Sequence, residues 1–274
     1  MSREERSLPF EVRAERLRWG DVMAYLEEDD RVLLPVGALE QHGAHLAMGT
    51  DTMTAAAVSV DAARAAGVLV YPPVWYGWSE SHMAFAGSVT LSAATLQAVL
   101  EDVVLSLCRH GFRRFVLVNG NRRANLPPMQ IAASNLMRAP GRLVAVADVA
   151  YLAFRRTAEI RRSASGGIGH AGEMETSHML YLQPDCVWPE QARACPARPV
   201  GFQASFLASD PAHESGDRYF LPRTPEAFRQ ASRGTGVAGD PTVASRETGE
   251  LAHQAMVEGL IALLDLLKAT PVKG

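Results

Sequence analysis

Several features that define other protein classes are missing from this sequence. The 274 residues contain only three cysteines, without a CxxC spacing, which argues against a disulfide framework or a thiolate zinc site and suits a reducing compartment. No apolar run reaches the roughly 20 residues that a membrane span requires. The segment MSREERSLPFEVRAERL lacks the apolar core of a signal peptide. We therefore expect a cytoplasmic protein.

The sequence also lacks a large excess of positive or negative charge. The chain has 27 lysines and arginines against 30 aspartates and glutamates, so it offers no electrostatic case for nucleic-acid binding. No GxGxxG motif follows an apolar run, which removes the sequence evidence for a dinucleotide-binding oxidoreductase. We expect a small-molecule substrate, and neither nucleic acid nor a membrane as a partner.

What the sequence does contain is an alternation of short apolar runs with longer, alanine-rich segments of helical spacing. Because short connections join them, we predict a three-layer α/β sandwich with a mostly parallel sheet flanked by helices. The predicted strands are residues 32–36, 68–71, 115–118 and 143–149, and the predicted helices include residues 52–66, 96–110 and 247–269.

The ends of these helices and the extent of the domain can be predicted too. Asp51 or Thr52 is expected to cap the first helix and Ser92 the second, while Gly67 and Gly111 follow their last residues. We expect one domain over residues 1–274. Within it, residues 192–228 are rich in Pro, Ser, Asp and Gly, and they form either a lid or an arm that contacts another subunit.

Polar clusters follow the predicted strands, where ligand sites of parallel sheets gather. The first cluster lies in LPVGALEQHGAHLAMGTD, residues 34–51, and contains Glu40, His42 and Asp51. Glu40 and His42 are two residues apart, so both point to one face of an extended strand end. Carboxylate and imidazole groups suit Zn²⁺, Mn²⁺ or Fe²⁺. The alternative is a polar loop in which Asp51 only caps the helix.

Four segments resemble signature motifs of the creatininase (creatinine amidohydrolase) family. They are LPVGALEQHGAHLAMGTD, YGWSESHMAFAGSVTL, HAGEMETS and GVAGDPTVASRETG, in the family's order. The resemblance implies a flavodoxin- or Rossmann-like sandwich, often a hexamer built from dimers, so we expect a homo-oligomer, either a hexamer or a dimer. It also implies a two-metal centre that activates water, with Glu40 binding one ion, His42 the other, and Asp51 bridging them.

Two more polar clusters follow the second and third predicted strands, GWSESH and NGNRRAN. NGNRRAN departs from the family pattern NGHGGN or NGHxE, whose histidine is a metal ligand. Here Asn121 replaces the histidine, and Arg123 stands at the place of the glutamate. Either the centre holds one ion, or Asn121 or another histidine substitutes as a ligand, or the arginines replace one ion as an electrophilic clamp. We favour one ion beside a pocket lined by Arg122 and Arg123 for an anionic or polyhydroxylated substrate. The alternative has both arginines facing solvent at a helix start.

Further roles follow from the resemblance. His170 corresponds to the catalytic histidine that shuttles a proton to the leaving group. Glu175 is the expected additional metal ligand. Glu173 is the second choice and a candidate catalytic residue. The two glutamates lie about 200° apart on a helix, so they cannot both face the same ion.

The remaining candidates are expected near the substrate. His82 either contacts the substrate or packs as a polar residue, and Trp78 either stacks on a flat ring or lies at a subunit interface. Asn125 is a candidate hydrogen-bond partner of a polyol. We expect Zn²⁺ first, with Mn²⁺ or Fe²⁺ as alternatives, at one or two ions per chain.

The function that these residues favour is metal-dependent hydrolysis of a small cyclic or amide-like substrate. The resemblance implies other reactions as well, namely deformylation, peptide trimming and opening of the ring ketone of an oxidised inositol. The alternative from another class is a family member that has lost catalysis and only binds a ligand or builds an assembly.

Overall fold

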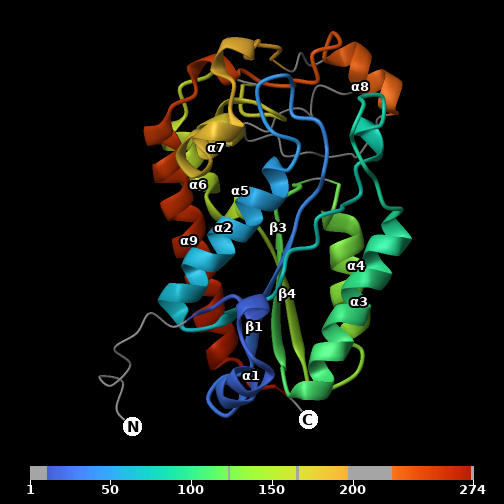
Figure 1. The fold of residues 1–274 in the computed structure, drawn as a ribbon, viewed down its shortest axis with the longest axis vertical. Helices are drawn as coiled ribbons and strands as arrows, with labels where there is room; N and C mark the ends of the chain where they lie inside the picture. Colours follow the sequence, from blue (N-terminus) through green and yellow to red (C-terminus); the bar gives the residue numbers. More distant parts are fainter. Residues whose placement is uncertain (1–10, 123, 165–166, 197–223, 273–274) are drawn as a thin grey trace.

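A parallel four-stranded sheet forms the centre of the computed structural model, which describes residues 11–122, 124–164, 167–196 and 224–272 (Figure 1). The strand order is β2-β1-β3-β4. Val36 lies opposite Asn119, and Asn119 lies opposite Asp148, so three strands end at the same level. The strands are β1 (Arg31–Val36), β2 (Leu69–Val70), β3 (Arg114–Asn119) and β4 (Leu143–Asp148).

Helices cover both faces of this sheet, because both faces are apolar. Side chains of a strand alternate between the two faces. Leu33 and Val116 pack toward α2 (Thr50–Ala66) and α9 (Arg246–Ala269), while Leu34 and Leu117 pack toward α3 (Ala93–His110) and α4 (Leu126–Leu136). The predicted three-layer sandwich is therefore confirmed.

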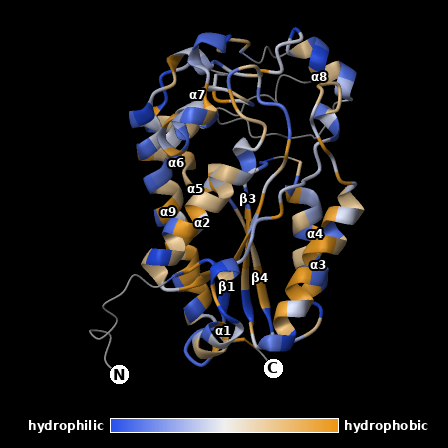
Figure 2. Ribbon diagram, viewed as in Figure 1, coloured by the Kyte–Doolittle hydropathy of each residue, from blue (hydrophilic) through white to orange (hydrophobic). Residues whose placement is uncertain are grey.

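Hydropathy follows the same layers. The strands and the helix faces turned toward them are hydrophobic, and the outer helix faces are largely hydrophilic (Figure 2). Among the described residues, no helix combines the length and the apolar composition that crossing a membrane requires. All three cysteines are free thiols.

Most predicted helix ends agree with the structure, and one does not. Ser92 accepts a hydrogen bond from Thr95 N (3.1 Å), and Gly67 and Gly111 adopt the left-handed conformation after α2 and α3. The prediction that Asp51 or Thr52 caps α2 is wrong. The N-cap is Gly49, and the carboxylate of Asp51 points toward His42 instead of the free backbone N–H groups.

At the upper end of the molecule, the loop after β1 lies together with segments that come late in the chain, including α7 and α8 (Figure 1). Residues 197–223, most of the predicted lid or arm, lie outside the described residues, and α8 begins just after them. The single domain stays a prediction. The remaining α-helices are α1 (Trp19–Leu26), α5 (Val149–Leu152), α6 (Phe154–Ile160), α7 (Glu173–Leu182) and α8 (Pro225–Ala231). The short 3₁₀ turns are η2 (Ala14–Arg16), η3 (Glu80–His82), η4 (Pro184–Cys186), η5 (Pro189–Gln191) and η7 (Pro241–Val243).

Candidate active site

Close contact between α2 and the strand ends places Asp51 at the centre of the site. A Cβ atom at Gly120, directly after β3, would lie 2.1 Å from the backbone oxygen of Asp51, so this position requires glycine. Asp51 lies in the first turn of the 17-residue helix α2. Amide dipoles at a helix N-terminus stabilise a carboxylate there. The local sequence thus holds a buried negative charge above the sheet.

Glu40, His42 and Asp51 converge as the sequence predicts. All three side chains are buried, and ligand atoms of the three lie within 4.8 Å of one another. His42 Nδ1 lies 3.0 Å from the backbone oxygen of Glu40, which leaves Nε2 facing Asp51 Oδ1 at 3.1 Å. The loop after β1 therefore turns one imidazole toward two carboxylates.

Helix α7 adds a third carboxylate. Glu175 Oε2 lies 3.8 Å from His42 Nε2 and accepts a hydrogen bond from the backbone N–H of Ala171 (2.6 Å). Ligand atoms of His42, His170 and Glu175 form a second close group. Of the two glutamates that the sequence offered from this segment, the structure brings Glu175 to the cluster.

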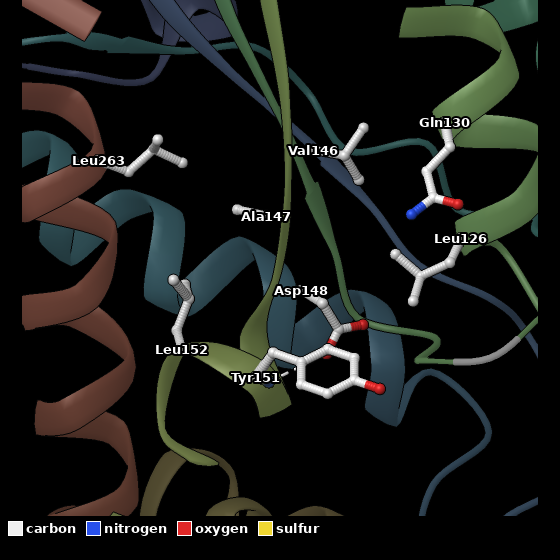
Figure 3. A pocket seen from close by; sticks show the side chains of 8 residues that line it. All are labelled: Leu126, Gln130, Val146, Ala147, Asp148, Tyr151, Leu152 and Leu263. Carbon is white, nitrogen blue, oxygen red and sulfur yellow. Dashed lines mark hydrogen bonds between the residues drawn. The ribbon is translucent and has the colours of Figure 1, made fainter. Parts of the chain in front are cut away.

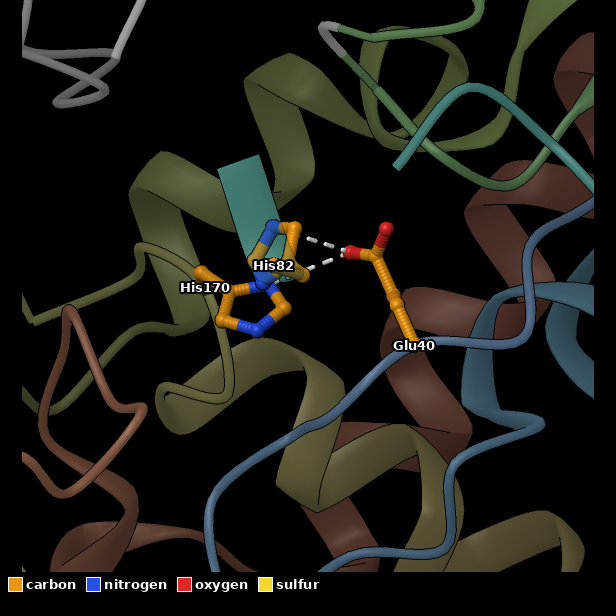
Figure 4. A group of neighbouring side chains, drawn as sticks. All are labelled: Glu40, His82 and His170. Carbon is orange, nitrogen blue, oxygen red and sulfur yellow. Dashed lines mark ion pairs between the residues drawn. The ribbon is translucent and has the colours of Figure 1, made fainter. Parts of the chain in front are cut away.

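Two further imidazoles, those of His82 and His170, face one carboxylate oxygen of Glu40 (Figure 4). His82 Nε2 lies 3.2 Å from Glu40 Oε1, and His170 Nδ1 lies 3.8 Å from the same oxygen. The two imidazole rings have their centroids 4.4 Å apart. Of the two expectations for His82, substrate contact or polar packing, the described contacts correspond to packing against Glu40.

Crowding of buried carboxylates sets the electrostatics of the cluster. Burial, followed by the charge of Asp51, raises the pKa of Glu40 to about 8. Burial also raises the pKa of Glu175 to about 7, although His42 opposes this rise. Burial lowers the pKa of His42, but the charges of Asp51 and the two glutamates outweigh it and raise that pKa to about 10. The imidazolium of His42 thus offsets part of the negative charge of the cluster, and burial favours the protonated form of Glu40 near neutral pH.

The cluster has the donor set of a divalent cation site. One carboxylate oxygen, Asp51 Oδ2, is buried and has no hydrogen-bond partner in the described part of the chain, although buried polar atoms are normally paired. Carboxylate oxygens and imidazole nitrogens are suitable ligands for Zn²⁺ or Mn²⁺. A cation would neutralise the carboxylates and displace the proton of His42. The residues therefore fit a metal ion.

The NGNRRAN segment contributes less directly. Asn121 turns its amide nitrogen to the cluster and donates to Glu40 Oε2 (2.8 Å), so its oxygen does not face the candidate ligands. The guanidinium carbon of Arg122 lies 4.7 Å above the ring of Tyr151. Burial raises the pKa values of Glu175 and Asp148, and the charge of Arg122 opposes this rise. Arg123 lies outside the described residues. Arg122 is half-buried, unlike an arginine that projects freely into solvent.

A cavity of about 350 Å³ opens beside the carboxyl end of β4, between α4 and α9 (Figure 3). Asp148 lines it, and burial raises the pKa of this carboxyl to about 6. Asp148 Oδ2 accepts from Asn119 Nδ2 (2.8 Å), and Asn119 Oδ1 accepts from the N–H of Asn121 (3.0 Å). Because Asn121 in turn donates to Glu40, a chain of hydrogen bonds links Asp148 at the cavity to Glu40. The cavity is lined by Leu126, Gln130, Val146, Ala147, Asp148, Tyr151, Leu152 and Leu263.

Three residues predicted for the site make structural contacts outside the cluster of carboxylates and imidazoles. Asn125 is fully buried; its oxygen accepts from Trp78 N (2.9 Å) and its nitrogen donates to the backbone oxygen of Gly37 (2.9 Å). The oxygen and the nitrogen of the Asn125 amide are therefore both hydrogen-bonded to the backbone. The side chain of Trp78 packs against the core under α3 and α4. The carboxylate of Glu173 accepts from Arg162 N and from the backbone and hydroxyl of Ser163.

Glu173 is therefore expected to stabilise the fold. In the variant Glu173→Gln, an amide N–H faces one of the three groups at Arg162 and Ser163 that donate to the wild-type carboxylate. The free energy of unfolding should therefore fall by about 1–3 kcal/mol. Urea unfolding measures this loss. Glu258→Gln, at an exposed position on α9, is the matched control. Loss of metal binding in Glu173→Gln with unchanged stability would contradict this assignment.

Sequence reasoning missed two residues at the site. Gln41 lies inside the first motif, but its side chain carries no charge and is not a usual metal ligand, so it was not predicted. Phe228 of α8 is 4% exposed, and its ring centroid lies 4.7 Å from that of His82 and 5.7 Å from that of His170. It covers the two imidazoles with an apolar ring. No local signal in residues 224–231 points to this role.

Comparison with known proteins agrees with the motif resemblance. The family model described as "Creatinine amidohydrolase" matches residues 15–264. Creatinine amidohydrolase of Pseudomonas putida is 33% identical over 260 residues, covering 89% of this chain and 92% of that protein. Mycofactocin precursor peptide peptidase of Mycolicibacterium smegmatis is 31% identical, covering 83% of this chain and 81% of its own. The 3-dehydro-scyllo-inosose hydrolase of Thermotoga maritima is 27% identical, covering 89% and 77%.

Solved structures agree with this result. A structure titled "Creatininase Mn" superposes with a TM-score of 0.78 at 28% identity, covering 95% of this chain and 100% of that one. A "Zn-Zn type" mutant creatininase superposes with a TM-score of 0.77 at 28% identity and the same coverage. The resemblance read from the motifs is confirmed, and the similar proteins named here are hydrolases.

Proposed function

Because the chain belongs to the creatininase family of hydrolases, we propose that it is a metal-dependent hydrolase acting on the carbonyl group of a small cyclic or amide-like substrate. The observation that carries this proposal is the convergence of the Glu40, Asp51 and Glu175 carboxylates on the imidazoles of His42 and His170. One oxygen of this group, Asp51 Oδ2, is buried and has no hydrogen-bond partner among the described residues. A polar loop with no ligand has no reason to bury Glu40 and Asp51 together and to bring the partly exposed carboxylate of Glu175 to the same imidazole.

Each residue has a distinct proposed role. Glu40, His42, Asp51 and Glu175 hold the cation, which when bound polarises a substrate carbonyl and activates water. His170 accepts a proton from the attacking water at Nδ1 and passes it to the leaving group. Burial and the neighbouring imidazoles hold the pKa of His170 well below its usual value, so the ring is neutral and has a lone pair available near neutral pH.

One tightly bound ion per chain is the expected stoichiometry. The nitrogen of Asn121 donates to Glu40, so this side chain does not replace the missing ligand in the described arrangement. Titration of the metal-free protein with Zn²⁺ or Mn²⁺, followed by desalting and elemental analysis, measures the count. Two equivalents retained per chain would refute the single-ion expectation and leave the hydrolase proposal intact.

The polar part of the substrate is proposed to bind beside Arg122. Its guanidinium carbon lies 4.7 Å above the ring of Tyr151, which lines the cavity beside β4. The planar guanidinium group holds several N–H donors in a fixed geometry, which suits a carboxylate, a phosphate or a polyol. The cavity beside β4 provides space for the remainder of such a molecule.

Turnover assays on the metal-loaded protein test the proposed reaction. Lactams, formamides, short peptides and cyclic polyol ketones are supplied after loading with Zn²⁺, Mn²⁺ or Fe²⁺. Ring ketones are included because one similar protein is an inosose hydrolase, which makes C–C bond hydrolysis the second candidate reaction. Hydrolysis of a lactam, formamide or peptide supports the leading proposal. Tight metal binding without turnover of any class would favour a non-catalytic family member.

We also propose that the chain assembles as a homo-oligomer, a dimer or a hexamer, and acts in the cytoplasm. Large apolar side chains remain exposed on the isolated chain, including Trp19 at 79% and Trp188 at 45%. Apolar surface of this kind is commonly buried between subunits. Sedimentation equilibrium of the purified protein measures the assembly state.

A further inference from the structure

The side chain of Gln41 lies between the two histidines that face Glu40. Its amide nitrogen is 2.8 Å from His82 Nδ1, 3.0 Å from His170 Nε2 and 3.0 Å from the backbone oxygen of Gly236. Its amide oxygen accepts a hydrogen bond from the N–H of Gly43 (2.9 Å). Gln41 is buried and carries no charge, so none of the roles proposed above includes it.

Two backbone groups determine which way this amide points. Gly43 N–H can only donate, and the carbonyl of Gly236 can only accept. Exchanging the nitrogen and oxygen of Gln41 would therefore place donor against donor and acceptor against acceptor. A Cβ atom at Gly236, whose φ is +73°, would lie 1.9 Å from Gln41 Oε1, so only glycine permits this contact.

The orientation of the amide determines the proton position on His82. Of the three neighbours of Gln41 Nε2, His170 Nε2 faces the backbone carbonyl of Gln41 at 2.8 Å and therefore carries its own proton. The two protons of Gln41 Nε2 then point to the carbonyl of Gly236 and to His82 Nδ1, so this ring nitrogen accepts a hydrogen bond. A neutral imidazole that accepts at Nδ1 carries its proton at Nε2. His82 Nε2 faces Glu40 Oε1 at 3.2 Å and therefore donates to it.

The backbone of the same residue determines the proton position on His170. His170 Nε2 lies 2.8 Å from the backbone carbonyl of Gln41, which can only accept, so Nε2 carries the proton. The lone pair of His170 is then at Nδ1, on the side of Glu40 Oε1. His42 is turned the other way, because its Nδ1 faces the backbone carbonyl of Glu40 and its Nε2 faces Asp51.

We propose that Gln41 is a positioning residue that makes His82 a hydrogen-bond donor to Glu40, and not a metal ligand, while its backbone turns the lone pair of His170 toward the cluster. Glu40, His82 and His170 lie close enough to hold a cation, but the proton on His82 Nε2 occupies the direction that a ligand would need. The histidine missing from NGNRRAN is therefore not replaced by His82. This inference rests on the proposed metal centre for its functional meaning.

Nitrogen-15 NMR of the imidazole rings in the metal-free protein tests the proton positions directly. We expect His82 Nδ1 to have the chemical shift of an unprotonated nitrogen in the wild type. In Gln41→Glu a carboxylate replaces the donor, so Nδ1 should become protonated and its shift should move accordingly. A protonated His82 Nδ1 in the wild type, or an unprotonated one in Gln41→Glu, overturns the inference. Because no metal is present, this result does not depend on the proposed function.

A double-mutant cycle on Zn²⁺ affinity tests whether Gln41 acts through His82. Gln41→Met and His82→Ala should each weaken binding by about 10- to 100-fold, as loss of a group behind a metal ligand does. If Gln41 acts through His82, the double variant should bind Zn²⁺ about as tightly as the single variant with the lower affinity. A loss of affinity in the double variant equal to the product of the two single losses would overturn the proposal. Gln254→Met, on the exposed side of α9, should leave the affinity unchanged, and thermal unfolding checks that each variant is folded.

Discussion

Asp51→Asn is expected to remove tight metal binding and hydrolysis together. The substitution keeps the shape of the side chain but removes the charge that lies 3.1 Å from His42 Nε2 and the unpartnered oxygen Oδ2. A neutral amide oxygen is a weak ligand for Zn²⁺. Since loss of a group merely behind a ligand costs about 10- to 100-fold in affinity, we expect a loss of more than about 100-fold here.

Competition with a chromophoric chelator measures the affinity of this variant. Asp102→Asn, at an exposed position on α3, controls for loss of a carboxylate as such and should bind metal like the wild type. Thermal unfolding of the metal-free proteins separates loss of the site from loss of the fold. Wild-type metal affinity in folded Asp51→Asn would show that this carboxylate is not a ligand, and full activity of metal-free wild-type protein would exclude a metal-dependent reaction.

His170→Ala is expected to lower kcat by about 100- to 10,000-fold, the usual contribution of a general acid–base group, while the protein retains its metal. His170 lies outside the buried Glu40–His42–Asp51 group, although it forms a second close group with His42 and Glu175. Its Nδ1 lies 3.8 Å from Glu40 Oε1, and we place it at the edge of the proposed ligand set. Removing a proton carrier from that edge leaves the four proposed ligands in place.

Steady-state kinetics and elemental analysis of the same preparation check this prediction. His110→Ala, at the exposed C-terminal end of α3, is the matched control and should have normal kcat. If His170→Ala loses its metal along with its activity, His170 is a ligand and not the proton carrier. If kcat is unchanged, another group transfers the proton.

Periodicity and turn residues predicted most of the fold. The apolar runs before residues 36 and 119 could only be buried strands, and the predicted strands agree with β1 and β3 within one residue at each end. Gly67 and Gly111 marked helix ends because the left-handed conformation strongly favours glycine. The N-terminus of α2 was misplaced, because Asp51 resembles a helix cap in sequence while its carboxylate interacts with a histidine nine residues earlier.

The candidate ligands were predictable for a different reason. Glu40, His42 and Asp51 follow one strand closely, so the chain itself brings them together, and Glu175 was identified by a motif. Glu173 has the same residue type and lies in the same motif, yet its carboxylate binds the backbone at Ser163. Sequence reasoning limited the choice to these two glutamates, because a helix cannot turn both toward one point, and contacts from another segment decided between them.

The sequence by itself determined that strands alternate with helices, that acidic and imidazole side chains follow the strands, and that the family motifs are present. Tertiary structure alone decided how those side chains are used, because hydrogen-bond partners come from distant segments. Gly236, far along the chain from Gln41, fixes the direction of an amide and so the proton on His82. Phe228 covers the same imidazoles from α8. Proton positions and burial depend on three-dimensional neighbours, and spacing along a chain does not specify them.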